Sequence, residues 1–376
     1  MPDFPFTESS IWTGLYCLFF YLFILILNYR RGVVNYGKIS ATHSFRVIML
    51  LLVCFFIITH CLKGDFFHLM EKVHDYVLIE GYYNYGEAVY PIIGDFVNNN
   101  YFLFRVIVWG GSFVLFLITS KRLDIDPYNA AMMLIMAHSI AFSYARASAA
   151  MALYFFGLSF LIKPAKHKLI GFIIGILLIV ASVAFHRSAL IMVLMTILLF
   201  VPINRWTITV FIVGFFILSG VFKEYFEIIA YSADIDDTVA DKLQRYSERT
   251  INSGIASRMS SLFDYASFLI PSYISLVIIL LNKKGRNIPI YYKKLNIISL
   301  GLVAVSVMFY FWGSSFVTFF YRILYMSMIP LTLSVCYMWN NRLITKKQML
   351  ICFLPGVFYN LFQYLYSVYL ANMGIN

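Results

Sequence analysis

The sequence consists of long apolar runs separated by short polar segments. A helix that spans a bilayer needs about 20 mainly apolar residues, and shorter runs can span where flanking residues help. The pattern therefore predicts about twelve membrane-spanning helices. They lie near residues 11–28, 45–62, 101–119, 128–144, 147–162, 169–185, 189–203, 206–222, 266–281, 295–312, 321–339 and 349–371. The expected fold class is an all-α, polytopic integral membrane protein with a single transmembrane domain over residues 1–376.

Two connections between the apolar runs are much longer than the others, at residues 63–100 and 223–265. Long connections in compact proteins are usually functional or disordered, and the aromatic residues, glycines and mixed charges found here favour a function. From Phe66 to Val77 apolar residues recur at helical spacing, which predicts a helix lying in the membrane interface. Candidate chemistry is therefore expected in these connections and at the helix ends beside them.

The composition agrees with a membrane protein. Hydrophobic residues make up 61% and charged residues 12% of the 376 residues, whereas soluble domains carry about 25% charged residues. Too little polar material remains to cover a water-soluble surface, which excludes a soluble enzyme, a disordered protein and a nucleic-acid-binding protein. The five cysteines are scattered through apolar runs, so neither a disulfide framework nor a metal site is expected.

The charges are distributed unevenly between the two sides of the predicted membrane domain. The chain carries 29 basic and 18 acidic residues, a net charge of +11. When successive connections alternate sides, one side receives 18 basic and two acidic residues, Asp124 and Asp126. Because cytoplasmic loops carry an excess of Lys and Arg, both termini and both long connections are expected to face outward. The two aspartates form an Asp-x-Asp string, which either binds a metal–nucleotide complex or reflects chance.

Arginine predominates among the outward basic residues. Of the 29 basic residues, 18 fall on the inward side and the remaining eleven on the outward side. Seven of the outward residues are arginines, and seven of the inward residues are arginines. A guanidinium group binds phosphate oxygens in a bidentate manner and loses water more readily than an ammonium group. Arg146, Arg187 and Arg322 each lie where two apolar runs meet, and Arg105 lies one turn inside its run. Such positions indicate either a functional group or a side chain that reaches the lipid headgroups.

Other outward residues suit sugar binding and proton transfer. Tyr83, Tyr85 and Tyr90 lie close to Glu87 in the first long connection. Tyrosine rings can stack on the apolar face of a pyranose while carboxylates accept hydrogen bonds from its hydroxyls; the alternative is an aromatic belt at the headgroup level. His186 lies between two apolar runs and is either a proton acceptor or a structural histidine.

A characteristic order of motifs occupies the centre of the chain. Arg146 is followed by Ala-Ser-Ala-Ala, a basic turn follows at 163–168, and the next run ends in Phe-His-Arg-Ser-Ala-Leu at 185–190. This order resembles the EpsG family of polysaccharide polymerases, which are relatives of the Wzy-type O-antigen polymerases. Gly-Asp at 64–65 and Gly-Glu-Ala-Val-Tyr at 86–90 are similar to outer-loop segments of that family. More weakly similar are the segment from Gly254 to Arg258 and the Tyr-Arg-Ile-Leu-Tyr string at 321–325.

The resemblance implies an undecaprenyl-diphosphate-linked oligosaccharide as donor and a second such unit as acceptor. The enzyme would join the units through a glycosidic bond on the outer face of the bacterial cytoplasmic (inner) membrane, making an O-antigen, capsule or exopolysaccharide. Expected partners are the bilayer, a chain-length regulator and a flippase. Expected diphosphate ligands are Arg146, Arg322, Arg258 and Arg187, and candidate catalytic groups are His186, Asp65 and Glu87. Because arginines neutralise the leaving group, no metal or other cofactor is required.

Three alternatives remain open on the sequence alone. A glycosyltransferase that uses a polyprenyl monophosphate sugar would also suit an aspartate in the first outer loop, where Asp65 lies. A flippase for lipid-linked units would place charges near the bilayer midplane and often shows internal repeats. A membrane O-acyltransferase would need its histidine close to a cytosolic acyl donor, whereas His186 is expected to face outward.

Overall fold

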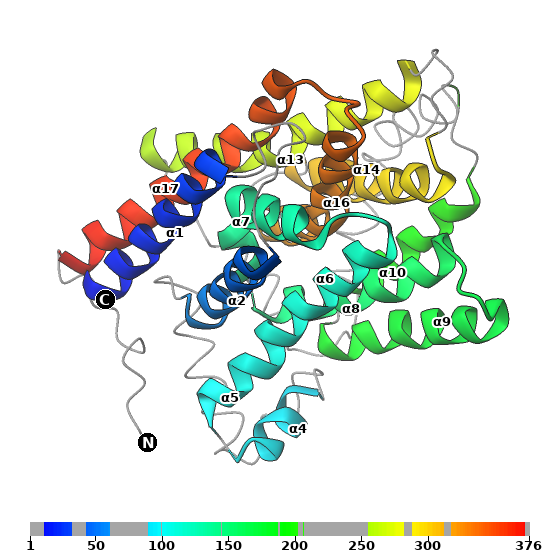
Figure 1. Ribbon diagram of the computed structural model, residues 1–376, viewed down its shortest axis with the longest axis horizontal. Coiled ribbons are helices and arrows are strands. Elements are labelled where there is room, and N and C mark those ends of the chain that lie inside the picture. The colour runs from blue at the N-terminus through cyan, green and yellow to red at the C-terminus, as the bar shows by residue number, and fades with distance from the viewer. Residues whose placement is uncertain are drawn as a thin grey trace, which may run out of the picture.

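The computed structural model describes residues 11–31, 43–60, 89–98, 100–143, 145–186, 189–201, 206, 255–281, 288–311 and 317–372. Within these ranges all regular elements are helices (Figure 1). The first half contains α1 (Ile11–Arg31), α2 (His43–Thr59), α4 (Val89–Phe96), α5 (Tyr101–Arg105), the π-helical turn η2 (Val106–Gly110), α6 (Gly111–Arg122), α7 (Pro127–Ser143), α8 (Ala145–Ile162), α9 (Lys168–Phe185), α10 (Ala189–Met195) and the 3₁₀ turn η3 (Thr196–Phe200). The second half contains α13 (Ile255–Leu281), α14 (Ile290–Phe311), α15 (Val317–Met326), α16 (Met328–Asn340) and α17 (Lys346–Asn372).

The predicted spans coincide with these helices or with consecutive helical pieces. The span at 206–222 lies outside the described residues apart from Trp206. Among the described helices, five segments are long and apolar enough to cross a bilayer: Phe102–Arg122, Lys168–Phe185, Leu262–Ile279, Ile290–Met308 and Lys346–Tyr366. Shorter apolar helices cover Gly14–Leu27, His43–Thr59, Ala147–Ile162 and Ala189–Phe200. The all-helical membrane class is confirmed, and the number of about twelve crossings stays a prediction.

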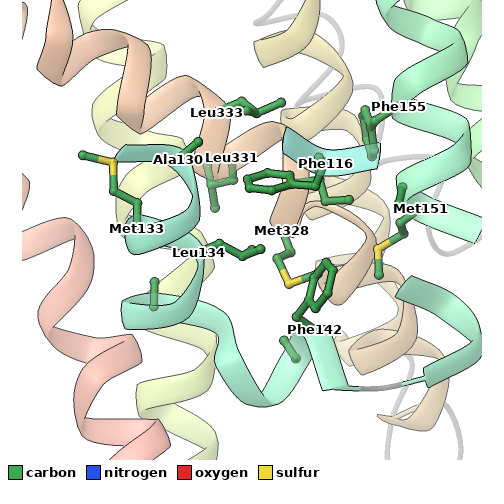
Figure 2. Packing of buried hydrophobic residues seen from close by; sticks show 14 of the residues in the cluster. Phe116, Ala130, Met133, Leu134, Phe142, Met151, Phe155, Met328, Leu331 and Leu333 are labelled. Carbon is green, nitrogen blue, oxygen red and sulfur yellow. The ribbon is translucent and has the colours of Figure 1, made fainter. Parts of the chain in front are cut away.

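Helices α7 and α16 form the centre of the bundle. Nearly every residue of both is buried, and Figure 2 shows Ala130 and Leu134 of α7 on the side that faces Leu331 of α16. At one end of this pair the Asn129 amide nitrogen donates to the side-chain oxygen of Asn340, at 3.2 Å. The first turn of α7 and the last turn of α16 therefore lie at the same end of the bundle.

The same end collects the ion pairs of the short connections. Arg46 pairs with Asp126 at 3.1 Å, and Lys163 pairs with Asp124 at 2.5 Å. Arg122 donates to the backbone oxygen of Lys163 at 2.6 Å. We call this the basic end, defined by these five residues. Each aspartate of the Asp-x-Asp string thus has its own cation, and Asp126 also accepts from a backbone N–H in the first turn of α7.

Helix α7 is broken at His138, whose φ of −136° and ψ of 28° are not helical. A broken helix at membrane depth is tolerated only where its free backbone groups find partners. Here the backbone oxygen of Met136 accepts from the Tyr21 hydroxyl at 2.7 Å and from the Asn360 amide at 3.2 Å. The side-chain oxygen of Asn360 in turn accepts from the N–H of Ile140 at 3.4 Å. Helices α1 and α17 therefore stabilise the break, and they run side by side in Figure 1.

Helices α8 and α9 form a tightly packed antiparallel hairpin (Figure 1). A β-carbon added to Gly157 would lie 2.7 Å from the backbone oxygen of Gly175, and one added to Gly175 would lie 2.9 Å from that of Gly157. Small residues allow such close approach of membrane helices. The opposite face of α9 exposes large apolar side chains, including Phe172 and Leu177, which suits contact with lipid.

Candidate functional site

The hairpin of α8 and α9 places two of the predicted site residues at one level. Arg146 lies eleven residues from Gly157 on α8, and His186 lies eleven residues from Gly175 along α9. At 1.5 Å per residue, both are about 16 Å from the point where the helices cross. Because the Lys163 turn joins the two helices at the basic end, Arg146 and His186 lie at the opposite end of the bundle. The fold thus brings together residues that are 40 positions apart.

The backbone of His186 is fixed at the end of α9. Its N–H donates to the carbonyl of Ser182 at 3.2 Å, and its own carbonyl accepts from the N–H of Ala189 at 2.8 Å. The backbone is extended there, with φ of −159° and ψ of 122°, and the residue is half-buried. These contacts hold the backbone of His186 at the end of α9.

Tyr90 connects the end of the first long connection to this turn. Its ring centroid lies 6.0 Å from that of Phe185, the residue before His186, and 6.1 Å from that of Phe104. Only 5% of Tyr90 is exposed. The contact places α4 beside the end of α9, so Tyr90 holds its segment next to His186; a direct contact of Tyr90 with sugar stays a prediction.

Arg258 and Arg322 lie on two helices that are in contact, α13 and α15. The Tyr325 hydroxyl donates to Asp264 at 2.9 Å, and the rings of Tyr265 and Tyr321 lie 5.5 Å apart. Arg322 immediately follows Tyr321 on α15, and Arg258 lies six residues before Asp264 on α13. For Arg146, Arg258 and Arg322 the structure describes the helical backbone, and their roles as diphosphate ligands stay predictions.

Five of the predicted site residues lie outside the described part of the chain: Asp65, Tyr83, Tyr85, Glu87 and Arg187. The interfacial helix predicted in residues 63–100 also lies outside it, because the described part of this connection comprises 89–98 and 100. Within the second connection, 223–265, residues 255–265 form the first turns of α13. The roles assigned to these residues stay predictions.

Arg105 has a structural environment. The side chain is fully buried, and its guanidinium donates to the backbone oxygens of Ile58 and His60, the latter at 2.7 Å. It also lies 4.8 Å from the centre of the Trp109 ring. The last carbonyls of a helix have no partner within it, so Arg105 caps the C-terminus of α2. The sequence allowed two interpretations of Arg105, a functional group or a side chain that reaches the lipid headgroups. Neither describes this buried capping position.

Asp264 is a buried acidic residue that the sequence interpretation did not single out. It is 1% exposed and accepts a hydrogen bond from Tyr325, whose ring lies 5.8 Å from that of Phe268 and whose hydroxyl contacts that of Tyr359. The ring of His138, at the break in α7, lies 4.5 Å from that of Phe268. The sequence does contain a signal for Asp264, because it is the third residue of an apolar segment that begins at Leu262. The span predicted from the sequence begins at residue 266 and therefore leaves Asp264 outside it.

Comparison with known proteins identifies the family. The model of the EpsG family matches residues 15–376, which is nearly the whole chain. No curated protein and no solved structure matches the chain. The resemblance inferred from the motifs around Arg146 and His186 is therefore confirmed. The chain belongs to the EpsG family, the family of Wzy-type polymerase-like proteins.

Proposed function

We propose that the protein polymerises oligosaccharide units linked to undecaprenyl diphosphate into a surface polysaccharide, on the outer face of the bacterial cytoplasmic membrane. Membership of the EpsG family supports a role as a polysaccharide-biosynthesis polymerase. The observation that carries the site is the α8–α9 hairpin, which ends with Arg146 and His186 at one level. The basic end of the bundle is then cytoplasmic, in agreement with the distribution of basic residues.

The proposed reaction transfers the growing chain from its lipid carrier to a new unit. An acceptor hydroxyl oxygen attacks the anomeric carbon of the donor, a glycosidic bond forms, and the bond from that carbon to the phosphate oxygen breaks. The electron pair leaves with undecaprenyl diphosphate, whose charge the guanidinium groups neutralise. The guanidinium groups are those of Arg146 and Arg322, followed by Arg258 and Arg187.

The proton of the acceptor hydroxyl passes to a base at the end of the bundle opposite the basic end. The candidates are His186, Asp65 and Glu87, because a group within hydrogen-bond reach must accept this proton in the transition state. Tyr83, Tyr85 and Tyr90 are the proposed sugar-binding residues. The positive charge comes from the arginines, so this scheme uses no cofactor. A flippase that supplies the units and a chain-length regulator are the proposed protein partners.

The experiment is complementation of a deletion strain, followed by electrophoresis of its surface polysaccharide. Arg146→Ala should abolish the long chains while leaving the protein level and the single-unit product intact. Lys121→Ala removes an exposed positive charge next to Arg122 of the basic end and serves as the matched control, with an unchanged ladder expected. Wild-type chain length in the Arg146→Ala strain would contradict the proposal. A product extended by one sugar would instead support a monophosphate-dependent glycosyltransferase.

A further inference from the structure

Three helices meet at a buried chain of hydrogen bonds. Asp264 of α13, Tyr325 of α15 and Tyr359 of α17 are 1%, 5% and 8% exposed. The Tyr325 hydroxyl donates to Asp264 Oδ2 at 2.9 Å, and the hydroxyl oxygens of Tyr325 and Tyr359 are 3.3 Å apart. Because the single hydroxyl proton of Tyr325 is directed at Asp264, Tyr359 is the donor in the second contact. The Asp264–Tyr325–Tyr359 chain thus joins three helices through side chains.

A buried carboxylate at this position is costly. The described aspartates at the basic end, Asp124 and Asp126, each pair with a cation, whereas no cationic side chain within the described residues pairs with Asp264. Apolar residues would hold packed helices together at lower cost, since an acidic group in a membrane bundle must be desolvated. An ionisable residue inside a membrane bundle is therefore a functional candidate by default.

The chain acts on a short, separate helix. Helix α15 has ten residues and ends at Met326, and α16 begins at Met328. Between them Ser327 keeps helical backbone angles, with φ of −78° and ψ of −9°, and its N–H and hydroxyl both donate to the carbonyl of Leu324, at 3.0 and 2.7 Å, which tightens the helix at this point. Helix α15 packs along α14, and its side-chain contacts fix it on the other helices. Two of these join it to α13: the Tyr325–Asp264 hydrogen bond and the Tyr321–Tyr265 ring pair.

The two helices joined in this way are the ones that carry two of the proposed diphosphate ligands. Arg322 lies three residues before Tyr325, less than one helical turn, and Arg258 lies six residues before Asp264. We propose that the Asp264–Tyr325–Tyr359 chain positions the diphosphate site, by fixing α15 on α13 and with it the separation of Arg322 and Arg258. Asp264 is then a positioning residue that acts through Tyr325. This inference rests on the proposed function.

The test measures binding of two lipids to the purified full-length protein in nanodiscs. The probes are undecaprenyl diphosphate and undecaprenyl monophosphate, and the variants are Tyr325→Phe, Asp264→Asn and Asp264→Leu. Tyr292→Phe is the matched control: Tyr292 is 1% exposed, and its hydroxyl lies 3.1 Å from that of Ser275 on α13. Ser275 lies eleven residues from Asp264, about 16 Å along the helix, so this control removes a comparable buried hydroxyl away from α15.

We expect Tyr325→Phe and Asp264→Leu to weaken diphosphate binding about tenfold, which is the loss expected when a charged group no longer reaches its hydrogen-bond partner. Binding of the monophosphate should weaken less. Asp264→Asn should lose less, because its amide oxygen can still accept from Tyr325. Tyr292→Phe should bind both lipids like the wild type. A merely structural role would lower the stability of both Tyr→Phe variants without this selective loss.

Two outcomes separate the inference from the proposed function. If the wild type does not prefer the diphosphate to the monophosphate, the proposed function fails and the positioning role fails with it. If the wild type does prefer the diphosphate but Tyr325→Phe binds it as tightly as Tyr292→Phe, only the positioning role is overturned. Should Asp264→Leu fail to fold, Tyr325→Phe decides, because it removes one hydroxyl and keeps the ring.

Discussion

The cap that Arg105 forms on α2 predicts a large loss of stability in the variant Arg105→Met. Methionine keeps an unbranched apolar chain but cannot donate to the carbonyls of Ile58 and His60, which now accept from the guanidinium. Each hydrogen bond to a charged group contributes about 1.5–3 kcal/mol, and the contact with the ring of Trp109 contributes about 1 kcal/mol. Removing the guanidinium also removes the cost of burying it. We therefore expect a net loss of about 3–5 kcal/mol in the free energy of unfolding.

The assay is equilibrium unfolding in mixed micelles, with Arg122→Met as the control. Arg122 is half-buried, donates to one backbone oxygen at 2.6 Å and lies 3.9 Å from the centre of the Phe160 ring. Losing one such bond at a partly exposed site should cost about 1 kcal/mol. Equal losses in the two variants would refute the capping argument. An Arg105→Met protein of normal stability that makes no polymer would place Arg105 in the substrate site instead.

Three further variants test the fold and the site. Gly157→Ala should lower the free energy of unfolding by about 1–3 kcal/mol and shorten the polysaccharide, because its β-carbon meets backbone that cannot move aside. In the control Gly111→Ala the added β-carbon has no neighbour within 4 Å, so neither effect is expected. Equal stability of the two variants would contradict the close crossing of α8 and α9. Asp124→Asn with Asp126→Asn should cost about 0–1 kcal/mol for each half-exposed ion pair and leave the ladder unchanged. Loss of polymer at a normal protein level would instead indicate a metal or nucleotide site. Arg146→Lys keeps the charge but not the bidentate fork, so electrophoresis should show chains shorter than those of the wild type; full length would mean that a point charge suffices.

The positions of the helices could be predicted from the sequence because the length of an apolar run directly reflects the thickness of the bilayer. The breaks inside those runs could not be predicted. The break in α7 at His138 depends on Asn360, which lies more than 200 residues away and supplies partners for the freed backbone groups. The division between α15 and α16 likewise depends on a local turn at Ser327 within a run that reads as one span.

The candidate site could be predicted in part. Arg146 and His186 were recognised by their motifs, and the tight hairpin of α8 and α9 explains why two such distant motifs belong to one end of the bundle. Arg105, like Arg146, lies next to apolar residues in the sequence, and only the carbonyls at the end of α2 identify it as a cap. Asp264 could not be recognised from its neighbours in sequence, because its partner Tyr325 lies 61 residues further on.

The proposed polymerase activity is tested most sharply by identifying the products that the purified protein forms from an undecaprenyl-diphosphate-linked repeat unit, with a chelator present. We expect a ladder of lipid-linked oligosaccharides spaced by one repeat unit, with one molecule of undecaprenyl diphosphate released for each glycosidic bond formed, as measured by mass spectrometry. Release of undecaprenyl monophosphate as the direct product, or movement of the lipid across the bilayer without any new bond, would contradict this activity.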